Sequence, residues 1–446
     1  MPFLYLKKLE VSSFLLRKIT TVLILLLAYQ NLSAQISNDI NDQAMKATGG
    51  NIITAVPFLL ISPDARASGM GGAGVASSPD INSQHWNASK FAFIDDDFGI
   101  SLTYAPWLRA LVRNVYLLYL AGYFRVDNNW VVGASMRFFS SGEVTFRRDR
   151  YDPPAVRLPH EYAFDVSLAR RISDNFSLAI TVRNVRSDLS SGFVDPLGET
   201  TISASSGAVD LSMFYTREIV RATRPTSFAL GMNVSNIGTK IRYSDAMLND
   251  FLPANLRLGG AFTTQIGSFS VITTLLDFNK LLVPMPSVPG DTVNPDPREL
   301  GIMQSVFRSF SDAPGRFREE IQISFGIEYV YNNIFAIRAG YFHEHQNKGG
   351  RQHFTAGAGL RLNVFEIDFA YLLPRPGNFT TAVDPLRNTM WFSFRVNFAR
   401  RGNLQQAVQR PQVSPRHRAL PCPPGQMRHN RSWDRPTSVF NHPTAR

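Results

Sequence analysis

The chain has 446 residues, of which 44% are hydrophobic, 12% aromatic and only 18% charged. Soluble domains average about 25% charged residues, so this composition favours a membrane barrel. No run of about 18 apolar residues follows residue 34, which excludes a helical membrane protein. The net charge of +11 comes from residues 1–34 (+3) and 400–446 (+8), so residues 35–399 are neutral overall. A basic nucleic-acid surface is therefore not expected in the body of the chain.

The first residues have the pattern of an export signal. Two basic clusters precede a short apolar run, residues 19–27, and the small residues Ser33 and Ala34 follow. A charged start, an apolar core and small residues before the cleavage point define a secretory signal peptide. We expect residues 1–34 to be removed before Gln35. An N-terminal membrane anchor is the alternative, but the apolar run is too short to span a bilayer.

From residue 97 to residue 398 the chain repeats one unit, in which about ten residues alternate between apolar and polar and a turn follows. A period of two residues places the apolar side chains on one face of a strand and the polar ones on the other. Fourteen segments have this pattern: 98–107, 113–125, 129–139, 161–172, 175–187, 205–217, 226–237, 255–266, 268–279, 320–331, 334–343, 352–362, 364–373 and 389–398.

The connections between these segments differ in length by parity. The links after segments 2, 4, 8, 10 and 12 are tight, whereas the link after segment 6, from Glu218 to Pro225, is an exception. The links after odd segments are mostly long, up to residues 280–319. Short turns at one end and long loops at the other are typical of outer-membrane barrels. The sequence therefore predicts an all-β fold, a transmembrane antiparallel β-barrel of about 14 strands in the outer membrane.

The two faces of the predicted strands carry different chemistry. Charged residues of both signs lie opposite the apolar faces, which suits a polar lumen: Asp165, Arg183, Asp210, Arg257, Glu328, Arg338, Arg361, Glu366 and Asp368. Aromatic residues recur near the strand ends and are interpreted as interfacial girdles, with ordinary core aromatics as the alternative: Tyr104, Trp107, Tyr123, Trp130, Phe138, Phe139 and Trp391.

The last predicted strand ends at Phe398, and a terminal strand ending in Phe is common in outer-membrane barrels. Residues 399–446 lack periodicity and are rich in Pro, Arg and His, so they are predicted to be a disordered basic tail. The only cysteine, Cys422, lies in this tail, so the body of the chain has no internal disulfide.

Few motifs point to chemistry. Residues 69–74 match GxGxxG, but Pro79 interrupts the helix that a dinucleotide site requires, so these glycines are interpreted as a tight bend. His343, His345 and His353 could approach one another, but no cysteine or ordered carboxylate set completes a metal site. No GxSxG or HExxH motif is present. We expect no catalytic, cofactor-binding or metal-binding residue, and no enzyme activity.

The segment before the first strand carries a specific resemblance. Residues 54–76 read TAVPFLLISPDARASGMGGAGVA, and SQHWN (83–87) and KFAF (90–93) follow. This pattern closely resembles the start of the PorV family, outer-membrane barrels of the type IX secretion system of Bacteroidetes. The resemblance covers roughly residues 49–398. One departure is Ala88, where family members usually have Pro.

The resemblance implies a FadL-like barrel in which residues 35–96 form an N-terminal plug and residues 97–398 the barrel. The residues it assigns to the plug are Pro57, Phe58, Asp64, Arg66, Gly69, Met70 and Gly71. It also implies a non-catalytic function: binding the C-terminal signal domains of secreted cargo as they leave the type IX translocon, and shuttling the cargo to an attachment complex with a PorU-like sortase. Outer-membrane lipid is the other expected partner, and nucleic acid is not one.

Cargo recognition is expected at the long loops, 140–160, 187–204, 238–254, 280–319 and 374–388. The apolar run Leu281 to Pro286 either is exposed for a partner or folds over the mouth of the barrel, and the sequence leaves both open. Two other functions also remain open: a FadL-like transporter of small hydrophobic molecules, and a scaffold within the same secretion machinery.

Overall fold

The computed structural model describes residues 52, 54–107, 114–146, 153, 155–189, 201–221, 224–243, 249–285, 296–312, 317–374 and 389–398. All of these residues belong to one compact unit of the chain. The predicted signal peptide (1–34) and the predicted basic tail (399–446) lie outside the described residues.

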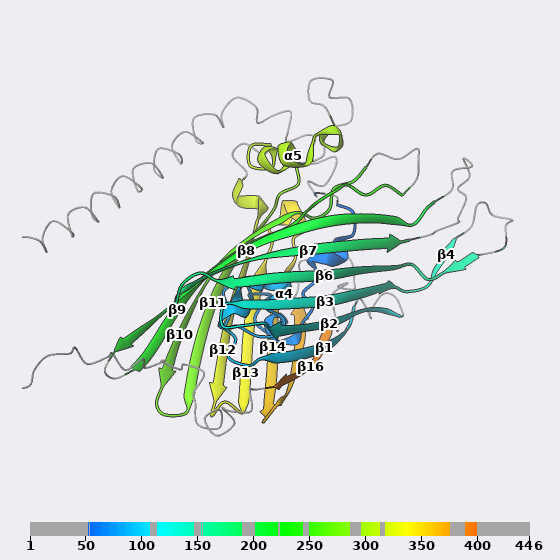
Figure 1. The fold of residues 1–446 in the computed structure, drawn as a ribbon. Coiled ribbons are helices and arrows are strands. Elements are labelled where there is room, and N and C mark those ends of the chain that lie inside the picture. The colour runs from blue at the N-terminus through cyan, green and yellow to red at the C-terminus, as the bar shows by residue number, and fades with distance from the viewer. Residues whose placement is uncertain are drawn as a thin grey trace, which may run out of the picture. The chain divides into compact units, whose positions relative to one another are not determined.

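Fourteen antiparallel strands form one closed barrel, which confirms the predicted fold class (Figure 1). Each strand pairs with its neighbours along the chain, and β1 closes the ring by pairing with β16, from Phe98↔Phe398 to Tyr104↔Phe392. The barrel strands are β1 (Phe98–Pro106), β2 (Val115–Arg125), β3 (Trp130–Ser141), β6 (His160–Arg171), β7 (Phe176–Asp188), β8 (Ala204–Arg221), β9 (Arg224–Gly238), β10 (Asn255–Ile266), β11 (Ser270–Leu281), β12 (Ile321–Tyr331), β13 (Phe335–His343), β14 (Gln352–Leu362), β15 (Phe365–Pro374) and β16 (Met390–Phe398).

Tight turns close the end of the barrel that holds Phe98 and Phe398. Asn332 and Asn333 have φ values of 48° and 57°, and Asn363 and Gly267 have 57° and 71°. Two-residue hairpins require this left-handed conformation, which Asn and Gly adopt at low cost. Because short turns face the periplasm in outer-membrane barrels, this end is the periplasmic one.

The link predicted from Glu218 to Pro225 is much shorter in the structure. β8 continues to Arg221 and β9 begins at Arg224, and these two residues pair. The backbones of β8 and β9 stay paired beyond the apolar band of the membrane. Apolar and polar side chains no longer alternate there, so the sequence pattern does not reveal the strand. The sixth barrel strand is therefore no exception, and its connection is as short as the others at the periplasmic end.

Side chains alternate between lipid and lumen along each strand. In β1, Phe98, Ile100 and Leu102 keep 40–52% of their surface exposed, whereas Ser101 and Thr103 keep 0–1%. A closed ladder satisfies every backbone group and leaves only apolar side chains to face the lipid. Of the nine charged residues predicted to face the lumen, eight are buried and Arg361 is half-buried.

Four of the aromatic residues assigned to the girdles face inward instead. Tyr123 and Trp391 are 2% and 3% exposed, and Trp107 and Phe139 pack against the buried apolar cluster around Phe58. The prediction considered only their nearness to strand ends, whereas the alternation along the strand decides which face a side chain occupies. Trp391 lies two residues before the inward-facing Ser393 and therefore faces inward as well. Tyr104 is 45% exposed on the outer surface, as predicted.

The described part of the segment before β1, residues 52 and 54–93, lies inside the barrel (Figure 1). It contains four short helices, η1 (Pro57–Leu60), α3 (Ala65–Ser68), α4 (Ser83–Trp86) and η2 (Ala88–Phe93). Their apolar side chains pack against inward-facing wall residues, for example Phe91 with Tyr119 and Tyr123. No helix among the described residues is long and apolar enough to cross a membrane.

The remaining described elements lie among the long connections at the opposite, outer end, where Figure 1 labels β4 and α5. They are the hairpin of β4 (Val144–Phe146) and β5 (Ala155–Arg157), followed by η3 (Pro297–Glu299), α5 (Ile302–Arg308), η4 (Phe317–Glu320) and η5 (Gln346–Lys348). Leu282 and Val283 are each 3% exposed and pack with Phe251 and Ala254. The described part of the apolar run after β11 therefore folds onto its own barrel and is not an exposed surface.

Candidate functional site

Of the seven residues in the predicted plug set, six are buried within the barrel, and Pro57 is exposed at the mouth cavity. Pro57 opens η1 directly after Val56, whose φ of 45° turns the chain. Phe58 is buried, and its ring stacks on Phe139 of β3 with centroids 6.1 Å apart. η1 therefore attaches to the wall through an aromatic contact near the outer end of the barrel.

Asp64 organises the next turn of the segment. Its carboxylate caps α3 by accepting a hydrogen bond from the Ala67 amide at 3.0 Å, and it accepts a second from Trp86 Nε1 at 2.6 Å. Trp86 belongs to α4 and lies 22 residues from Asp64 in the sequence, so one carboxylate joins two separate helices. Burial, and then the nearby charge of Asp80, raise the pKa of Asp64 to about 6.

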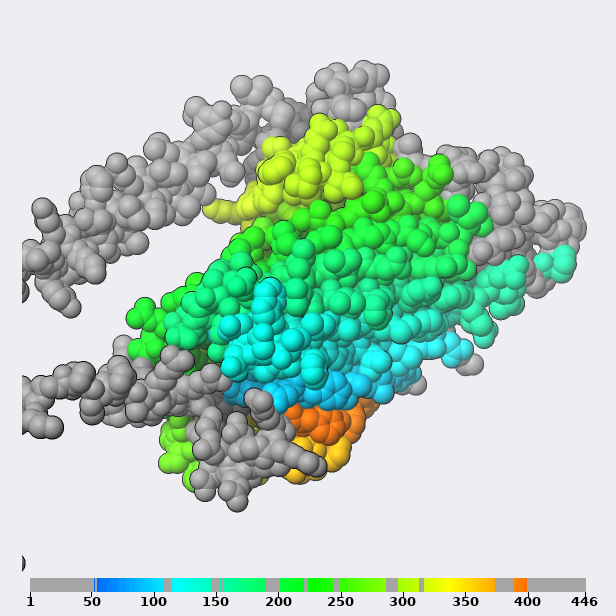
Figure 2. All heavy atoms as spheres, in the orientation of Figure 1, coloured from blue at the N-terminus to red at the C-terminus, as the bar shows by residue number. Residues whose placement is uncertain are grey.

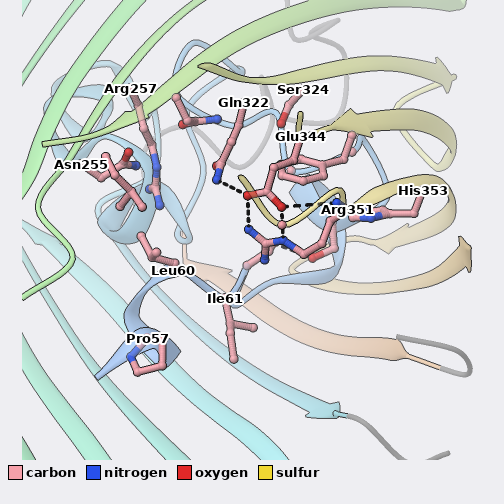
Figure 3. Close-up of a pocket in the computed structure, with 18 of the residues that line it drawn as sticks. Pro57, Leu60, Ile61, Asn255, Arg257, Gln322, Ser324, Glu344, Arg351 and His353 are labelled. Atoms are coloured by element: carbon pink, nitrogen blue, oxygen red, sulfur yellow. Dashed lines mark hydrogen bonds and ion pairs between the residues drawn. The ribbon is translucent and has the colours of Figure 1, made fainter. Parts of the chain in front are cut away.

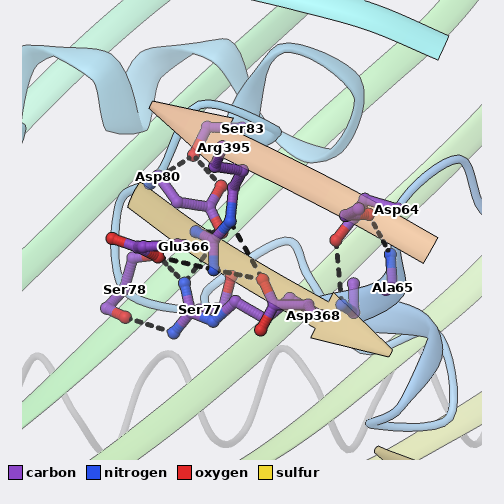
Figure 4. Close-up of polar contacts among 12 residues, drawn as sticks. Asp64, Ala65, Ser77, Ser78, Asp80, Ser83, Glu366, Asp368 and Arg395 are labelled. Carbon is purple, nitrogen blue, oxygen red and sulfur yellow. Dashed lines mark hydrogen bonds and ion pairs between the residues drawn. The ribbon is translucent and has the colours of Figure 1, made fainter. Parts of the chain in front are cut away.

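Arg66 lies in a closed ring of alternating charges that joins the segment to the wall. Its guanidinium contacts Glu328 of β12 at 2.7 Å and Asp80 at 2.8 Å. Figure 4 shows the side of the ring formed by Asp80, Asp368 and Arg395. The ring passes, with N–O distances of 2.5–3.8 Å, through Arg66, Glu328, Arg338, Asp368, Arg395 and back through Asp80.

This ring is buried, so its members depend on one another. Burial alone would raise the pKa of Asp80, but Arg66, Lys90 and Arg395 hold it below its ordinary value. Removing one partner from a buried charge pair leaves the other uncompensated, at a cost of about 3–5 kcal/mol. The ring therefore fixes the position of the segment against β12, β13, β15 and β16.

Glycines on both sides allow the segment to touch the wall at Gly69, Met70 and Gly71. Gly71 has a φ of +70°, and a Cβ there would lie 2.7 Å from the Tyr341 carbonyl oxygen. On the wall, a Cβ at Gly326 would lie 2.7 Å from Met70. Sequence reasoning missed the wall glycines, although their signal was available: Gly326 occupies an inward-facing position in an otherwise regular strand.

Two further anchors were not predicted. Asp277 of β11 accepts hydrogen bonds from the amides of Gly74 and Val75, at 2.7 and 2.9 Å. Lys90 of η2 donates to the Gly74 carbonyl at 2.7 Å and to the Ser77 hydroxyl at 2.9 Å. Burial is the main cause that lowers the pKa of Lys90 to about 8. Both side chains hold the glycine-rich bend in place against the wall.

A cavity of about 440 Å³ opens above the segment, at the outer mouth of the barrel (Figure 3). Pro57, Leu60 and Ile61 of the segment face it, and the ends of wall strands surround it. Apolar and polar groups share the lining, which includes Trp107, Trp391, Leu372, Asn255, Gln322 and His353. The cavity thus has a floor made of the chain's own residues and a rim where the long connections begin.

Charged pairs border this mouth cavity. Arg351 donates to both oxygens of Glu344, at 2.7 and 2.9 Å, and Gln322 donates to the same carboxylate at 2.8 Å. Glu320 bridges Lys280 and Lys348. The side chain of Arg351 is 44% exposed, so the rim presents a positive charge to the solvent.

The three histidines considered for metal binding have separate environments. His353 stacks on Phe342 with ring centroids 5.0 Å apart, whereas half-buried His345 caps η5 and lies 3.8 Å from Glu319. His343 lies at the end of β13, near the ring of Tyr341. Within the described part of the chain, no group of three His, Cys, Asp or Glu residues could hold a metal ion.

These features define an outer-membrane β-barrel whose lumen holds its own N-terminal segment beneath a mouth cavity. The model of the family "Type IX secretion system protein PorV" matches residues 44–288, more than half of the chain. The chain belongs to this family, as its sequence motif predicts. No curated protein matches the sequence.

Solved barrels show a distant similarity. The toluene transporter TodX of P. putida has 12% identity, covers 76% of this chain and 99% of its own, and gives a TM-score of 0.44. The toluene transporter TbuX of Ralstonia pickettii has 14% identity, with 76% and 100% covered and a TM-score of 0.41. A FadL homologue of Pseudomonas aeruginosa has 10% identity, with 76% and 98% covered and a TM-score of 0.39.

Proposed function

We propose that the protein binds the C-terminal signal domains of secreted cargo at its outer mouth and shuttles the cargo from the type IX translocon to the surface attachment complex. The observation that carries this proposal is the mouth cavity above a filled lumen. A cavity with a floor holds a ligand, whereas a conduit needs a continuous path. Membership of a protein-secretion family makes a protein ligand the natural choice.

The surrounding loops supply the rest of the proposed surface. A rigid barrel can present long connections to a partner without moving itself. We assign recognition to the connections within 140–160, 187–204, 238–254, 280–319 and 374–388, around the half-exposed Arg351. In this proposal, residues 35–96 act as a permanent plug, and the PorU-like sortase takes over the cargo without any catalytic step by this chain.

The alternative is a FadL-like transporter of small hydrophobic molecules. It requires a continuous apolar path from the mouth through or around the segment. The ionic ring holds Arg66 to Glu328 at 2.7 Å, and the cavity rim carries several charged pairs. Both features favour a fixed segment and a polar ligand surface over an apolar conduit.

One pull-down from detergent-solubilised membranes separates the two functions. The full chain carrying an affinity tag should retain cargo with an uncleaved signal domain, and deletion of its gene should trap such cargo in the periplasm. Normal surface cargo in the deletion strain would contradict the proposal. Co-purified fatty molecules without signal-domain proteins would favour the transporter.

A pair of charge reversals then tests the location of the site. Arg351→Glu reverses the half-exposed charge at the mouth, and we expect signal-domain affinity to fall about tenfold. Arg217→Glu reverses an exposed charge at the periplasmic end of β8 and is the matched control. Equal affinities of the two variants would move the binding surface away from the mouth.

A further inference from the structure

The lipid-facing wall formed by β1, β2, β3 and β6 contains a groove of about 320 Å³. This wall, cyan to teal, faces the viewer in Figure 1 and in Figure 2. Large apolar side chains line the groove, among them Phe98, Leu120, Phe124, Met136 and Phe164. A membrane barrel exposes such side chains to lipid, and here they border an open hollow in the wall.

The groove exists because two small residues lie side by side on the outer face. Gly122 of β2 pairs directly with Ala134 of β3, while the next strands carry Ile100 and Val166 at the same level. The levels above and below carry Leu120 with Met136, and Phe124 with Val132. The wall is therefore hollowed at one level between two levels of larger side chains.

A cation lies beyond the periplasmic end of this groove. Arg170 of β6 pairs with Trp130 of β3, and Trp130 is the next outward-facing residue of β3 after Val132 toward the periplasm. The guanidinium of Arg170 lies 4.9 Å from the centre of the Trp130 ring. Arg170 is exposed, and no carboxylate of the described residues forms an ion pair with it. An arginine that stacks on a tryptophan at the membrane interface is well placed to bind a phosphate.

We propose that this wall binds one glycerophospholipid of the periplasmic leaflet, with an acyl chain in the groove and the phosphate on Arg170. Four residues separate Trp130 from Ala134, which is roughly 13 Å along a strand. A phosphate at Arg170 therefore lies close enough for its own acyl chain to reach the hollow at Gly122 and Ala134. The positive charge selects a phosphate-bearing lipid, and the single hollow at Gly122 and Ala134 accommodates one acyl chain.

Native mass spectrometry of the full chain in detergent tests this site, with phosphatidylethanolamine as the probe. We expect one tightly retained lipid on the wild type. Ala134→Phe fills the hollow and should abolish retention. Arg170→Gln leaves the groove unchanged and should weaken retention about fivefold. Diacylglycerol with the same acyl chains serves as a second probe, because it lacks the phosphate. Its retention on the wild type should be as weak as the retention of phosphatidylethanolamine on Arg170→Gln.

Matched controls lie on other parts of the barrel surface. Ala339→Phe enlarges an outward-facing alanine of β13, and Arg217→Gln removes an exposed arginine at the periplasmic end of β8. Both should retain the lipid as the wild type does, and the heat-dependent gel mobility of each variant reports folding. Equal retention by the wild type, Ala134→Phe and Arg170→Gln overturns the proposal. A membrane protein captured at Val132 by a cross-linker, in place of lipid, would also overturn it.

Discussion

Two groups of charged side chains inside the barrel are held in different ways. The ring at the periplasmic half joins the N-terminal segment to the wall, and the side chains of Arg66 and Glu328 are 8% and 5% exposed. The group at the mouth joins strand ends to short loops, and Arg351 is 44% exposed although its partner Glu344 is 5% exposed. Water therefore screens Arg351 at the mouth, whereas Lys280, Glu320 and Lys348 beside it are as buried as the ring.

This difference separates a structural role from a binding role. Buried charges that are paired on both sides strongly resist the loss of any member. A half-exposed arginine exchanges its partner at little cost, because water replaces the lost contact. The ring is suited to keep the segment in place, and the mouth is suited to meet a ligand. The variants below test this contrast.

The largest effect is expected from Glu328→Gln. The substitution removes a charge that contacts both Arg66 and Arg338 at 2.7 Å, and it leaves two buried guanidinium groups short of a partner. We expect the free energy of unfolding to fall by about 3–5 kcal/mol, measured by urea unfolding in micelles with tryptophan fluorescence. Glu299→Gln, at the exposed end of η3, should change it little. A loss below about 1 kcal/mol would mean that the ring does not hold the segment.

A smaller loss is expected from Gly340→Ala on the wall. A Cβ at this position would overlap the backbone of Met70 and Gly71, so the segment must move away from β13. Overpacking of this kind costs typically about 1–3 kcal/mol. Gly260→Ala adds a Cβ whose nearest neighbour is 3.6 Å away, and it should be nearly neutral in the same urea assay. Equal stability of the two variants would show that the segment adapts freely to the wall.

Much of the barrel could be predicted because lipid imposes a regular pattern. Alternation along β12 and β15, together with the tight turns at Asn332 and Asn363, follows directly from the need to pair every backbone group. Where the pattern ends, the prediction was less accurate. β8 extends to Arg221 because its backbone stays paired with β9 beyond the lipid. Trp391 faces inward because it is an even number of residues from other inward-facing residues of β16.

The contacts of the segment were harder to predict than the strands. Its residues were identified by a motif, but their partners lie more than 200 positions away, as for Arg66 with Glu328 and Gly74 with Asp277. Such pairs depend on how the segment enters the barrel, and the local sequence pattern does not predict the path of the segment. The burial of Leu282 and Val283 depends in the same way on Phe251, across a loop of the outer face.

The ionisation of Asp64 gives a pH test that concerns the segment alone. Its pKa of about 6 in the folded protein lies above the value of 3.8 expected in the unfolded chain. The folded state therefore binds the proton more tightly, and this contribution to stability is full below about pH 4 and lost as pH rises through 6. Asp64→Asn keeps the cap on α3 but removes the titration.

In a comparison of the two proteins by urea unfolding, the wild type should lose about 1–3 kcal/mol relative to Asp64→Asn between pH 4 and pH 7. Asp80 should contribute little in this window, because Arg66 keeps its pKa below the ordinary value. Parallel pH profiles for the two proteins would contradict a raised pKa at Asp64.

The smallest effect on stability is expected at the mouth, from Arg351→Gln. This substitution removes the 2.7 Å contact with Glu344, but Gln322 still donates to that carboxylate and water reaches the vacated side. We expect the free energy of unfolding to fall by less than about 1 kcal/mol, although the same type of ion pair is lost as in the ring. The urea assay should therefore separate this variant clearly from Glu328→Gln. A loss as large as that of Glu328→Gln would show that the mouth is built as rigidly as the ring, and the assignment of the mouth as the ligand-binding surface would lose its physical basis.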